Sequence, residues 1–513
     1  MEETVEPQND GGEVNRRRNT VIVVGLLGFL LIVFVSIYIA SSRAELARVR
    51  ASLTKSGERL RPTEIVTNLP PGVSDGILDL LSAATAMPDT FGYSLGHAYQ
   101  QAGVRIVDSG IAILPAELRT GGGRVWVSNI WDEASPYVET NRHIWEIAAA
   151  TLTNDVIRTH LDWSKGFSAL SSGHLRDLKQ LVAWSAMAVA YDLHQGDQDT
   201  AMATATDGFR ILGKYQGDLT LIGQMTRNAM FTVLGMRTWL VLQHEGWSDD
   251  QLRELQAAIS SAQLAGSMLR GLEMERAMVI QLWEQMVADP KVAMGTLGAS
   301  GASPKTTLAS VALRVWSVGP AHGDMSWYLE RFQDELDLAR ASFSTKSYQH
   351  FGSVKSSRST PSPAWWQLMS KMVWLDFTRT VQQVCQVETF REMQIAAIAL
   401  RRHQMKHGHH PEKLDDLVPE FLPHSPVDWM DGRQLRYELL SDGSYKLWSV
   451  GHDLKDQGGD PSGWKKQDNH RMEDGLDWVW PSAATSAEMD SFIRPRRQKW
   501  LDSSHGVGAG MTP

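Results

Sequence analysis

Cysteine is almost absent from this chain of 513 residues, and Cys385 is its single occurrence. One cysteine excludes an intramolecular disulfide and any zinc site built from cysteine ligands. Cys385 lies in an apolar helical run, which favours a small buried side chain over a nucleophile. The cellular compartment stays open, because a protein in an oxidising space need not contain a disulfide.

A basic excess is also missing. The chain has 50 Lys and Arg residues against 59 Asp and Glu residues, a net charge of -9. Binding to nucleic acid needs a positive surface, so this balance argues against a nucleic-acid partner for the chain as a whole. The sequence also has no phosphate-loop, nucleophile-elbow or kinase motif, and we predict no catalytic residue and no enzymatic activity.

Long apolar runs are missing except for one. Residues 20–40 read TVIVVGLLGFLLIVFVSIYIA and contain no charge. At a rise of 1.5 Å per residue this run spans about 30 Å, the thickness of a hydrocarbon core. A cleaved signal peptide has a shorter apolar region and a small residue at the −3 position, where Tyr38 stands before Ala40. We therefore expect an uncleaved, single-pass signal anchor.

The charges that flank this run bear on its orientation. Arg16, Arg17 and Arg18 precede the run within a short tail, residues 1–19. More basic residues follow it, but they lead into a long domain, which can cross a membrane largely regardless of its charge. We expect a cytoplasmic tail at 1–19 and an extracytoplasmic location for most of the chain.

Residues 41–139 are predicted to be a juxtamembrane helix followed by a turn-rich segment. The composition stays helical over 41–60, and Pro62 ends that helix. A short helix is expected from Gly76 to Met87. The stretch 88–138 is rich in turn residues.

The segment 140–363 is predicted to be an α-helical domain. Apolar residues recur at helical spacing from Leu175 to Leu193. Gly196 and Asp197 end this helix, and Asp199 is expected to cap the next one.

Later helices of this domain are expected at 219–245 and, after a Ser248–Gln251 capping box, up to about Ala265. Helices joined by a Gly-Asp turn, with small residues where they cross, are similar to tetratricopeptide hairpins. Clusters of Gly, Ser and Pro at 295–304 and 352–363 predict exposed loops.

The segment 364–480 is predicted to hold a long helix to about Lys406 and then a small α+β module. The module begins with a short helix at Pro411–Leu417. Strands at Gln434–Leu439 and Ser444–Val450 follow, joined in a β-hairpin. Residues 481–513 are expected to be a flexible basic tail.

The order of motifs in this module resembles the globular domain of the major pseudopilins of type II secretion. There a helix is followed by G-x-Y-P-x-x-L-x-x-L, by a P-x-D-P-[WF]-G-x-P-x-x-Y turn and by a hairpin that ends in S-x-G-x-D-G. The resemblance covers about 75 of the 513 residues. The matching residues are Gly408, Pro411, Leu414, Leu417, Pro426, Asp428, Trp429, Gly432, Tyr437, Ser449, Gly451 and Asp453.

The whole chain is also similar to a group of long bacterial proteins with one N-terminal membrane helix, a helical middle and this ending. That resemblance implies the bacterial inner membrane and assigns no activity. Pilin precursors have a Gly at their cleavage point and a Glu five residues into the apolar helix. This chain instead has Asn19 and Thr20 at the junction and no acidic residue up to Ala40.

The resemblance further implies a calcium-binding loop after the hairpin. Asp453, Asp456 and Asp460 match that loop in position. Ca²⁺ takes six to eight oxygen ligands, which closely spaced Asp side chains and backbone carbonyls can supply. The alternative interpretation is a solvated acidic turn without a metal.

Together these observations predict a membrane-anchored, extracytoplasmic scaffold or interaction protein with protein partners in the cell envelope, related to secretion and without catalytic activity. Two alternatives stay open. One is a membrane-anchored hydrolase whose site lies in the helical domain, and the other is a divergent pseudopilus subunit.

Overall fold

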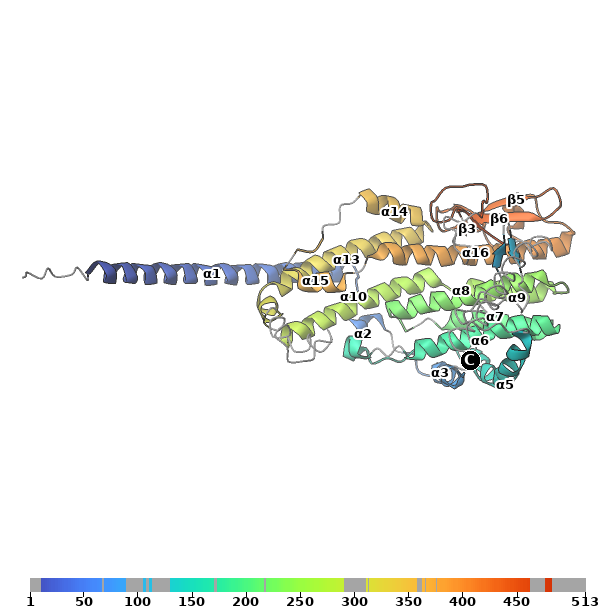
Figure 1. Ribbon diagram of the computed structural model, residues 1–513, viewed down its shortest axis with the longest axis horizontal. Coiled ribbons are helices and arrows are strands. Elements are labelled where there is room, and N and C mark those ends of the chain that lie inside the picture. The colour runs from blue at the N-terminus through green and yellow to red at the C-terminus, as the bar shows by residue number, and fades with distance from the viewer. Residues whose placement is uncertain are drawn as a thin grey trace, which may run out of the picture. The chain divides into compact units, whose positions relative to one another are not determined.

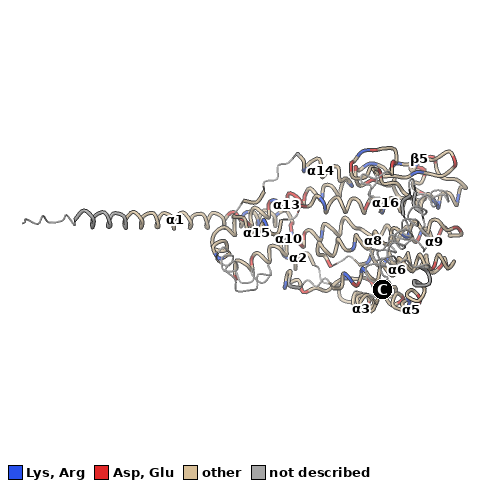
Figure 2. Tube along the Cα trace, in the orientation of Figure 1, with Lys and Arg blue, Asp and Glu red and all other residues tan. Residues whose placement is uncertain are grey.

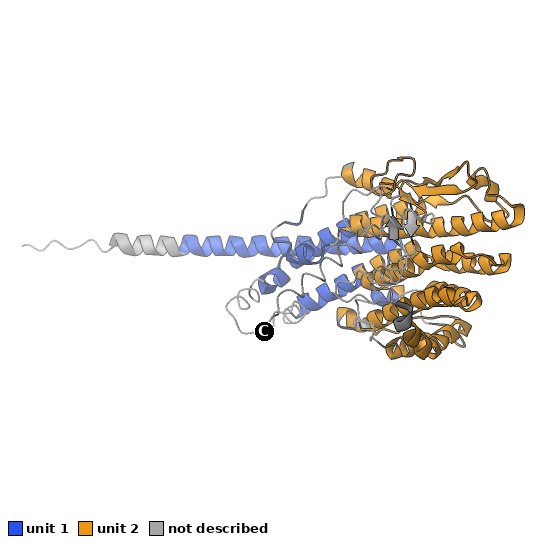
Figure 3. Ribbon diagram, turned by 45° about the vertical axis from the view of Figure 1, so that its right-hand side comes forward, with its two compact units in different colours: residues 1–64, 276–334, 360–375 blue, residues 65–275, 335–359, 376–513 orange. Residues whose placement is uncertain are grey.

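The chain is mainly α-helical in its computed structural model (Figure 1). It forms two compact units, coloured in Figure 3. Three of their boundaries fall within helices, namely α2 (Pro62–Ile65), α10 (Leu264–Ala288) and α13 (Ala321–Ser344). Unit 1 comprises residues 1–64, 276–334 and 360–375, and unit 2 comprises 65–275, 335–359 and 376–513. The structure describes residues 11–66, 69–88, 105–107, 110–112, 130–169, 173–215, 218–289, 311, 313–357, 362–364, 366–374, 376–461 and 476–481.

Helix α1 (Gly11–Lys55) contains the apolar run and continues beyond it without a break. The apolar side chains from Ile22 to Ile37 are exposed, and no charged residue colours this length of the helix (Figure 2). From Ser42 onward one face is buried, through Ser42, Leu46 and Leu53. The predicted continuation of the apolar helix is therefore confirmed, although α1 ends at Lys55, before the predicted end at Pro62.

The buried face of α1 packs within unit 1 beside α13 (Ala321–Ser344), and the two helices run in parallel. Near the start of α13, a Cβ on Gly323 would lie 3.5 Å from Ser42 Oγ and 3.6 Å from Tyr38 Oη. Farther along, just beyond the end of α1, Gln333 Nε2 donates to Glu58 Oε1 at 2.9 Å. These contacts at both ends fix the register of the two helices.

The core of unit 1 combines stacked aromatic rings with a buried carboxylate. Trp283 of α10 (Leu264–Ala288) lies 5.7 Å from both Trp316 and Tyr328, measured between ring centroids. The buried Asp324 accepts hydrogen bonds from Trp316 Nε1 at 2.9 Å and from the backbone N–H of Met369 at 3.1 Å. Asp324 thereby links α13 to the short helix α15 (Leu368–Val373).

Unit 2 is built around a layer of helices (Figure 1). Helix α6 contacts α7 and α8, α7 contacts α9, and α16 contacts both α8 and α9. Helices α3 and α5 pack on each other and on α6. The bounds are α3 (Ile77–Ala86), α5 (Ile130–Ala150), α6 (Gly173–Gln195), α7 (Gln198–Lys214), α8 (Leu221–Gln243), α9 (Asp249–Ser261), α14 (Tyr348–Ser357) and α16 (Phe377–His407), with 3-10 turns at Thr151–Thr153 and Trp163–Ala169.

One of the two helix caps predicted in this layer is confirmed. Ser248 and Gln251 form the expected reciprocal capping box of α9. The cap of α7 differs, because Asp197 accepts the hydrogen bond from Thr200 N. Asp199 lies inside the first turn, where it accepts from Gln251 Nε2.

Three segments differ from the prediction. Residues 348–357 form α14, although a loop was expected over 352–363. Phe351 is fully buried and anchors this helix despite its Ser and Gly residues. The helix expected from residue 364 is two helices, α15 and α16, and Asp376 caps the second one. Helix α5 begins at Ile130, within the stretch expected to be turn-rich. The predictions for residues 295–304 and 482–513 lie outside the described residues.

The C-terminal region contains two small antiparallel sheets that contact α16. In the first, β3 (Val427–Asp428) pairs with β4 (Arg433–Gln434). In the second, β5 (Arg436–Leu439) and β6 (Tyr445–Ser449) form the predicted hairpin, and β7 (Trp478–Val479) adds a third strand. The short helix after α16 is a 3-10 turn, η4 (Leu414–Leu417), and a separate two-stranded pair, β1 (Arg105–Val107) with β2 (Gly110–Ala112), was not predicted.

Candidate functional site: a buried polar network in the C-terminal region

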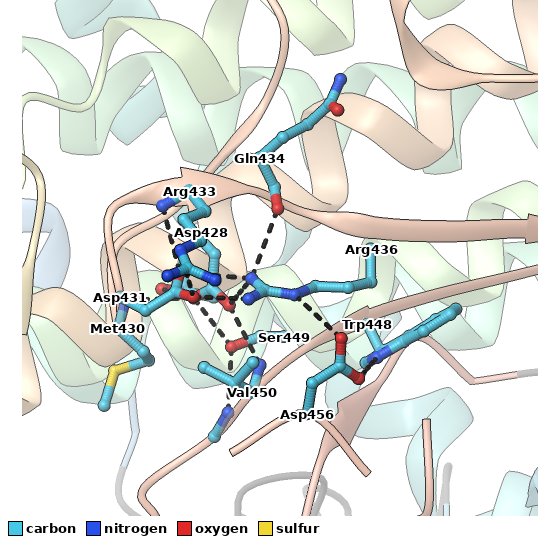
Figure 4. A network of polar contacts seen from close by, with 12 residues as sticks. Asp428, Met430, Asp431, Arg433, Gln434, Arg436, Trp448, Ser449, Val450 and Asp456 are labelled. Atoms are coloured by element: carbon cyan, nitrogen blue, oxygen red, sulfur yellow. Dashed lines mark hydrogen bonds and ion pairs between the residues drawn. The ribbon is translucent and has the colours of Figure 1, made fainter. Parts of the chain in front are cut away.

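Asp428 is the centre of a polar network that joins the two C-terminal sheets (Figure 4). Thr389 of α16 also contacts it, with its Oγ1 3.5 Å from Asp428 Oδ1. The side chain of Asp428 is fully buried. Oδ1 accepts from Ser449 Oγ at 2.8 Å and from Met430 N at 3.0 Å, and Oδ2 accepts from Val450 N at 3.0 Å. Asp428 and Ser449 belong to two different motifs of the sequence, and the fold brings them into direct contact.

Arg436 lies next to Asp428 and connects it to two further carboxylates. Its Nη1 lies 3.0 Å from Asp428 Oδ2, its Nη2 pairs with Asp431 Oδ2, and its Nε lies 3.5 Å from Asp456 Oδ2. Asp456 Oδ1 in turn accepts from Trp448 Nε1 at 3.0 Å. A planar guanidinium with several donors suits such multiple pairing.

Burial dominates the electrostatics of Asp428. It raises the pKa of this carboxyl to about 6, opposed by the hydrogen bonds from the backbone N–H groups of Met430 and Val450. The nearby charge of Asp431 raises this pKa further. The network therefore contains a carboxyl whose pKa lies well above that of an exposed Asp.

Of the three carboxylates predicted to bind calcium, Asp453 and Asp456 have other partners here. Asp456 is engaged by Arg436 and Trp448, as described above. Asp453 accepts from Lys455 N at 3.0 Å and from Gln457 Nε2 at 2.6 Å. Across the described part of the chain, no three His, Cys, Asp or Glu side chains gather in a metal-ligating arrangement. The calcium site stays a prediction.

Asp477 also binds the acidic loop at 453–460, although it belongs to none of the sequence motifs. The side chain is fully buried, and its Oδ2 accepts from the backbone N–H groups of Gln457, Gly459 and Asp460 at 2.9, 2.8 and 3.2 Å. The main chains of Asp477 and Asp460 also pair at 3.0 Å. Because Asp477 is distant from the loop in the sequence, no local pattern could predict these hydrogen bonds.

Other motif residues have structural roles as well. Tyr437 Oη donates to the carbonyl of Pro411 at 2.7 Å, which ties the hairpin to the turn after α16. Gly451 has a φ of 63°, and a Cβ there would lie 2.5 Å from the carbonyl oxygen of Leu476. The conformation and the lack of space both require glycine. The motifs thus build this module rather than an exposed reactive centre.

Histidines gather at the end of α16. The ring centroids of His403 and His407 lie 4.4 Å apart, and His403 Nδ1 bonds to the carbonyl of His409 at 2.9 Å. His403 and His407 also contact the ring of Phe421 edge-on. These contacts make the cluster part of the packing between the helix end and the following turn.

A His–Asp pair lies in the helical part of unit 2. His174 Nε2 is 3.2 Å from Asp218 Oδ2, and Asp218 Oδ1 accepts from Thr220 Oγ1 at 2.7 Å. A carboxylate that orients an imidazole is one element of a general base. Among the described residues, His174 has no second hydrogen-bond partner that could serve as a nucleophile.

Comparison of the chain with protein-family models, curated proteins and solved structures gives no match.

Proposed function

We propose that this protein is a single-pass membrane scaffold whose folded body acts through protein contacts outside the cytoplasm. The observation that carries the proposal is the continuity of α1. One helix has an exposed, uncharged apolar length and, beyond it, a buried face within unit 1. A membrane anchor of this kind is part of the folded domain rather than an appendage.

The contacts around the end of the apolar run support an uncleaved anchor. Tyr38 and Ser42 lie on either side of Ala40 and both approach Gly323 of α13. Farther on, Arg50 Nη2 pairs with Glu284 Oε1 at 2.7 Å. Cleavage after Ala40 would separate Tyr38 from a helix that unit 1 holds in place.

For the C-terminal region we infer a pseudopilin-like module that recognises a protein partner in the cell envelope. The helix, the 3-10 turn and the hairpin follow one another in the expected order. Two pairs of motif residues, Asp428 with Ser449 and Pro411 with Tyr437, are in contact. The hairpin tip exposes Leu439 and Leu440 by 38% and 36%, which leaves apolar surface for a partner.

A reporter fused after Pro513 tests the topology. A reporter active only outside the cytoplasm is expected, together with crosslinks from the C-terminal region to other envelope proteins. Activity confined to the cytoplasm would contradict the proposal.

The hydrolase alternative has its best support in His174 and Asp218. It would require that His174→Ala abolish hydrolysis of a simple ester while the protein stays folded. The scaffold proposal instead expects no such activity in the unaltered protein.

A further inference from the structure

An exposed apolar ridge lies on the short helical stretch that precedes α13 in unit 1. Val311, Val315 and Val318 are exposed by 54%, 65% and 64%. Their spacing of four and three residues places them on one helical face. Leu313 and Trp316, on the other face, are buried. We call these three exposed valines the valine ridge.

The valine ridge lies close to the point where α1 leaves its apolar run. Gly323 comes five positions after Val318, which limits the distance between them to about 18 Å even for an extended chain. Gly323 itself adjoins Tyr38 and Ser42, on either side of the end of that run. The ridge is therefore near the level at which a membrane surface would meet α1.

The composition around the ridge suits the boundary between water and lipid. Arg314 is exposed between the valines. Arg43 follows the apolar run of α1 by three residues. Apolar side chains flanked by Arg are typical of segments that lie in the interface, because the long basic side chains reach the phosphates.

We propose that the valine ridge inserts into the interfacial layer of the bilayer that holds α1. The inference rests on the proposed membrane anchor. It adds a second contact between unit 1 and lipid, which would fix the orientation of unit 1 relative to the membrane surface.

The test uses the full chain in phosphatidylcholine nanodiscs, with Cys385→Ala as background and an environment-sensitive fluorophore on a single introduced cysteine. Lipids brominated on their acyl chains quench only a fluorophore within the bilayer. The labelled positions are Val315→Cys, Val318→Cys, Phe34→Cys in the apolar run, and Asp334→Cys on α13. Asp334 is 53% exposed, and its neighbour Gln333 bonds to Glu58, which lies just beyond the end of α1 and far from the apolar run.

Brominated lipid is expected to lower the fluorescence at positions 315, 318 and 34 at least twofold and to leave position 334 unchanged. Quenching at position 34 without quenching at 315 and 318 would overturn the proposed insertion of the valine ridge, and the membrane anchor would still stand. A blue-shifted but unquenched signal at 315 would also overturn it, because a protein surface would then cover the ridge. No quenching at position 34 would refute the anchor itself.

Discussion

Arg276 and Glu58 form a buried ion pair in unit 1, with 2.8 Å between Nη2 and Oε2. The two side chains are 0% and 9% exposed. Arg276 also donates to the carbonyl of Arg59 at 3.2 Å. The pair therefore connects α10 with the chain segment that comes directly after α1. It attaches the C-terminal end of the proposed anchor helix to unit 1.

Removing one partner of this pair should destabilise unit 1 strongly. Arg276→Met leaves the Glu58 carboxylate buried without its cation, a change that costs about 3–5 kcal/mol. Amide hydrogen exchange over residues 42–58 should increase accordingly. Arg253→Met removes an exposed pair with Asp250 at 2.6 Å, and it should change stability by less than about 0.5 kcal/mol. Equal effects of the two variants would contradict a structural role for the buried pair.

Asp428 should make the stability of the C-terminal region depend on pH. Its folded pKa of about 6 lies above the ordinary value of 3.8, so between these values the folded state binds more protons than the unfolded state. The free energy of unfolding contributed by this group is thus greatest below about pH 4 and falls as pH rises through 6. The full difference is about 3 kcal/mol.

Hydrogen exchange of residues 436–449 at pH 5 and pH 7.5, corrected for the intrinsic exchange rates, measures this dependence. The stability advantage of the unaltered protein over Asp428→Asn should be greater at pH 5. Asp442→Asn, in the exposed hairpin turn, is the control, because Asn also suits such turns. A constant difference between the unaltered protein and Asp428→Asn at the two pH values would contradict the raised pKa.

The acidic loop offers a test of the calcium prediction. Asp456→Asn removes a charge that faces Arg436, and exchange over residues 451–460 should rise. If protein contacts alone hold the loop, this rise will be the same with calcium and with chelator. Calcium-dependent protection of the unaltered protein that disappears in the variant would support the metal site.

Gly235 should be required where α8 crosses α16. A Cβ at this position would lie 2.5 Å from Phe390 Cε1 and 2.7 Å from Gln394 Nε2. Gly235→Ala should therefore cost about 1–3 kcal/mol through overpacking. A Cβ added to Gly266 of α10 would have no atom within 4 Å, so Gly266→Ala should stabilise by about 0.5–1 kcal/mol. Thermal unfolding compares the two, and destabilisation by both would refute this account of the crossing.

Local sequence patterns predicted local structure well. The uncharged run, the Ser248–Gln251 cap and the β5–β6 hairpin each depend on neighbouring residues, and all three were predicted. Large aromatic side chains fill the helical core, where Trp184, Trp283 and Trp316 are fully buried.

Long-range polar partners could not be predicted in the same way. Asp428 was picked out by its motif, but its contacts with Ser449 and Arg436 depend on how two sheets pack. Asp477 and Arg276 belong to no motif, and their partners lie far away in the sequence. One sequence shows no coupling between such positions, so their roles emerge only from the fold.

Alkaline carbonate extraction of membranes, followed by an intact-mass measurement of the protein that remains bound, tests the central claim most directly. The account predicts that the protein stays in the membrane fraction with residues 20–40 still attached. Release into the soluble fraction, with a mature chain that begins after Ala40, would contradict it.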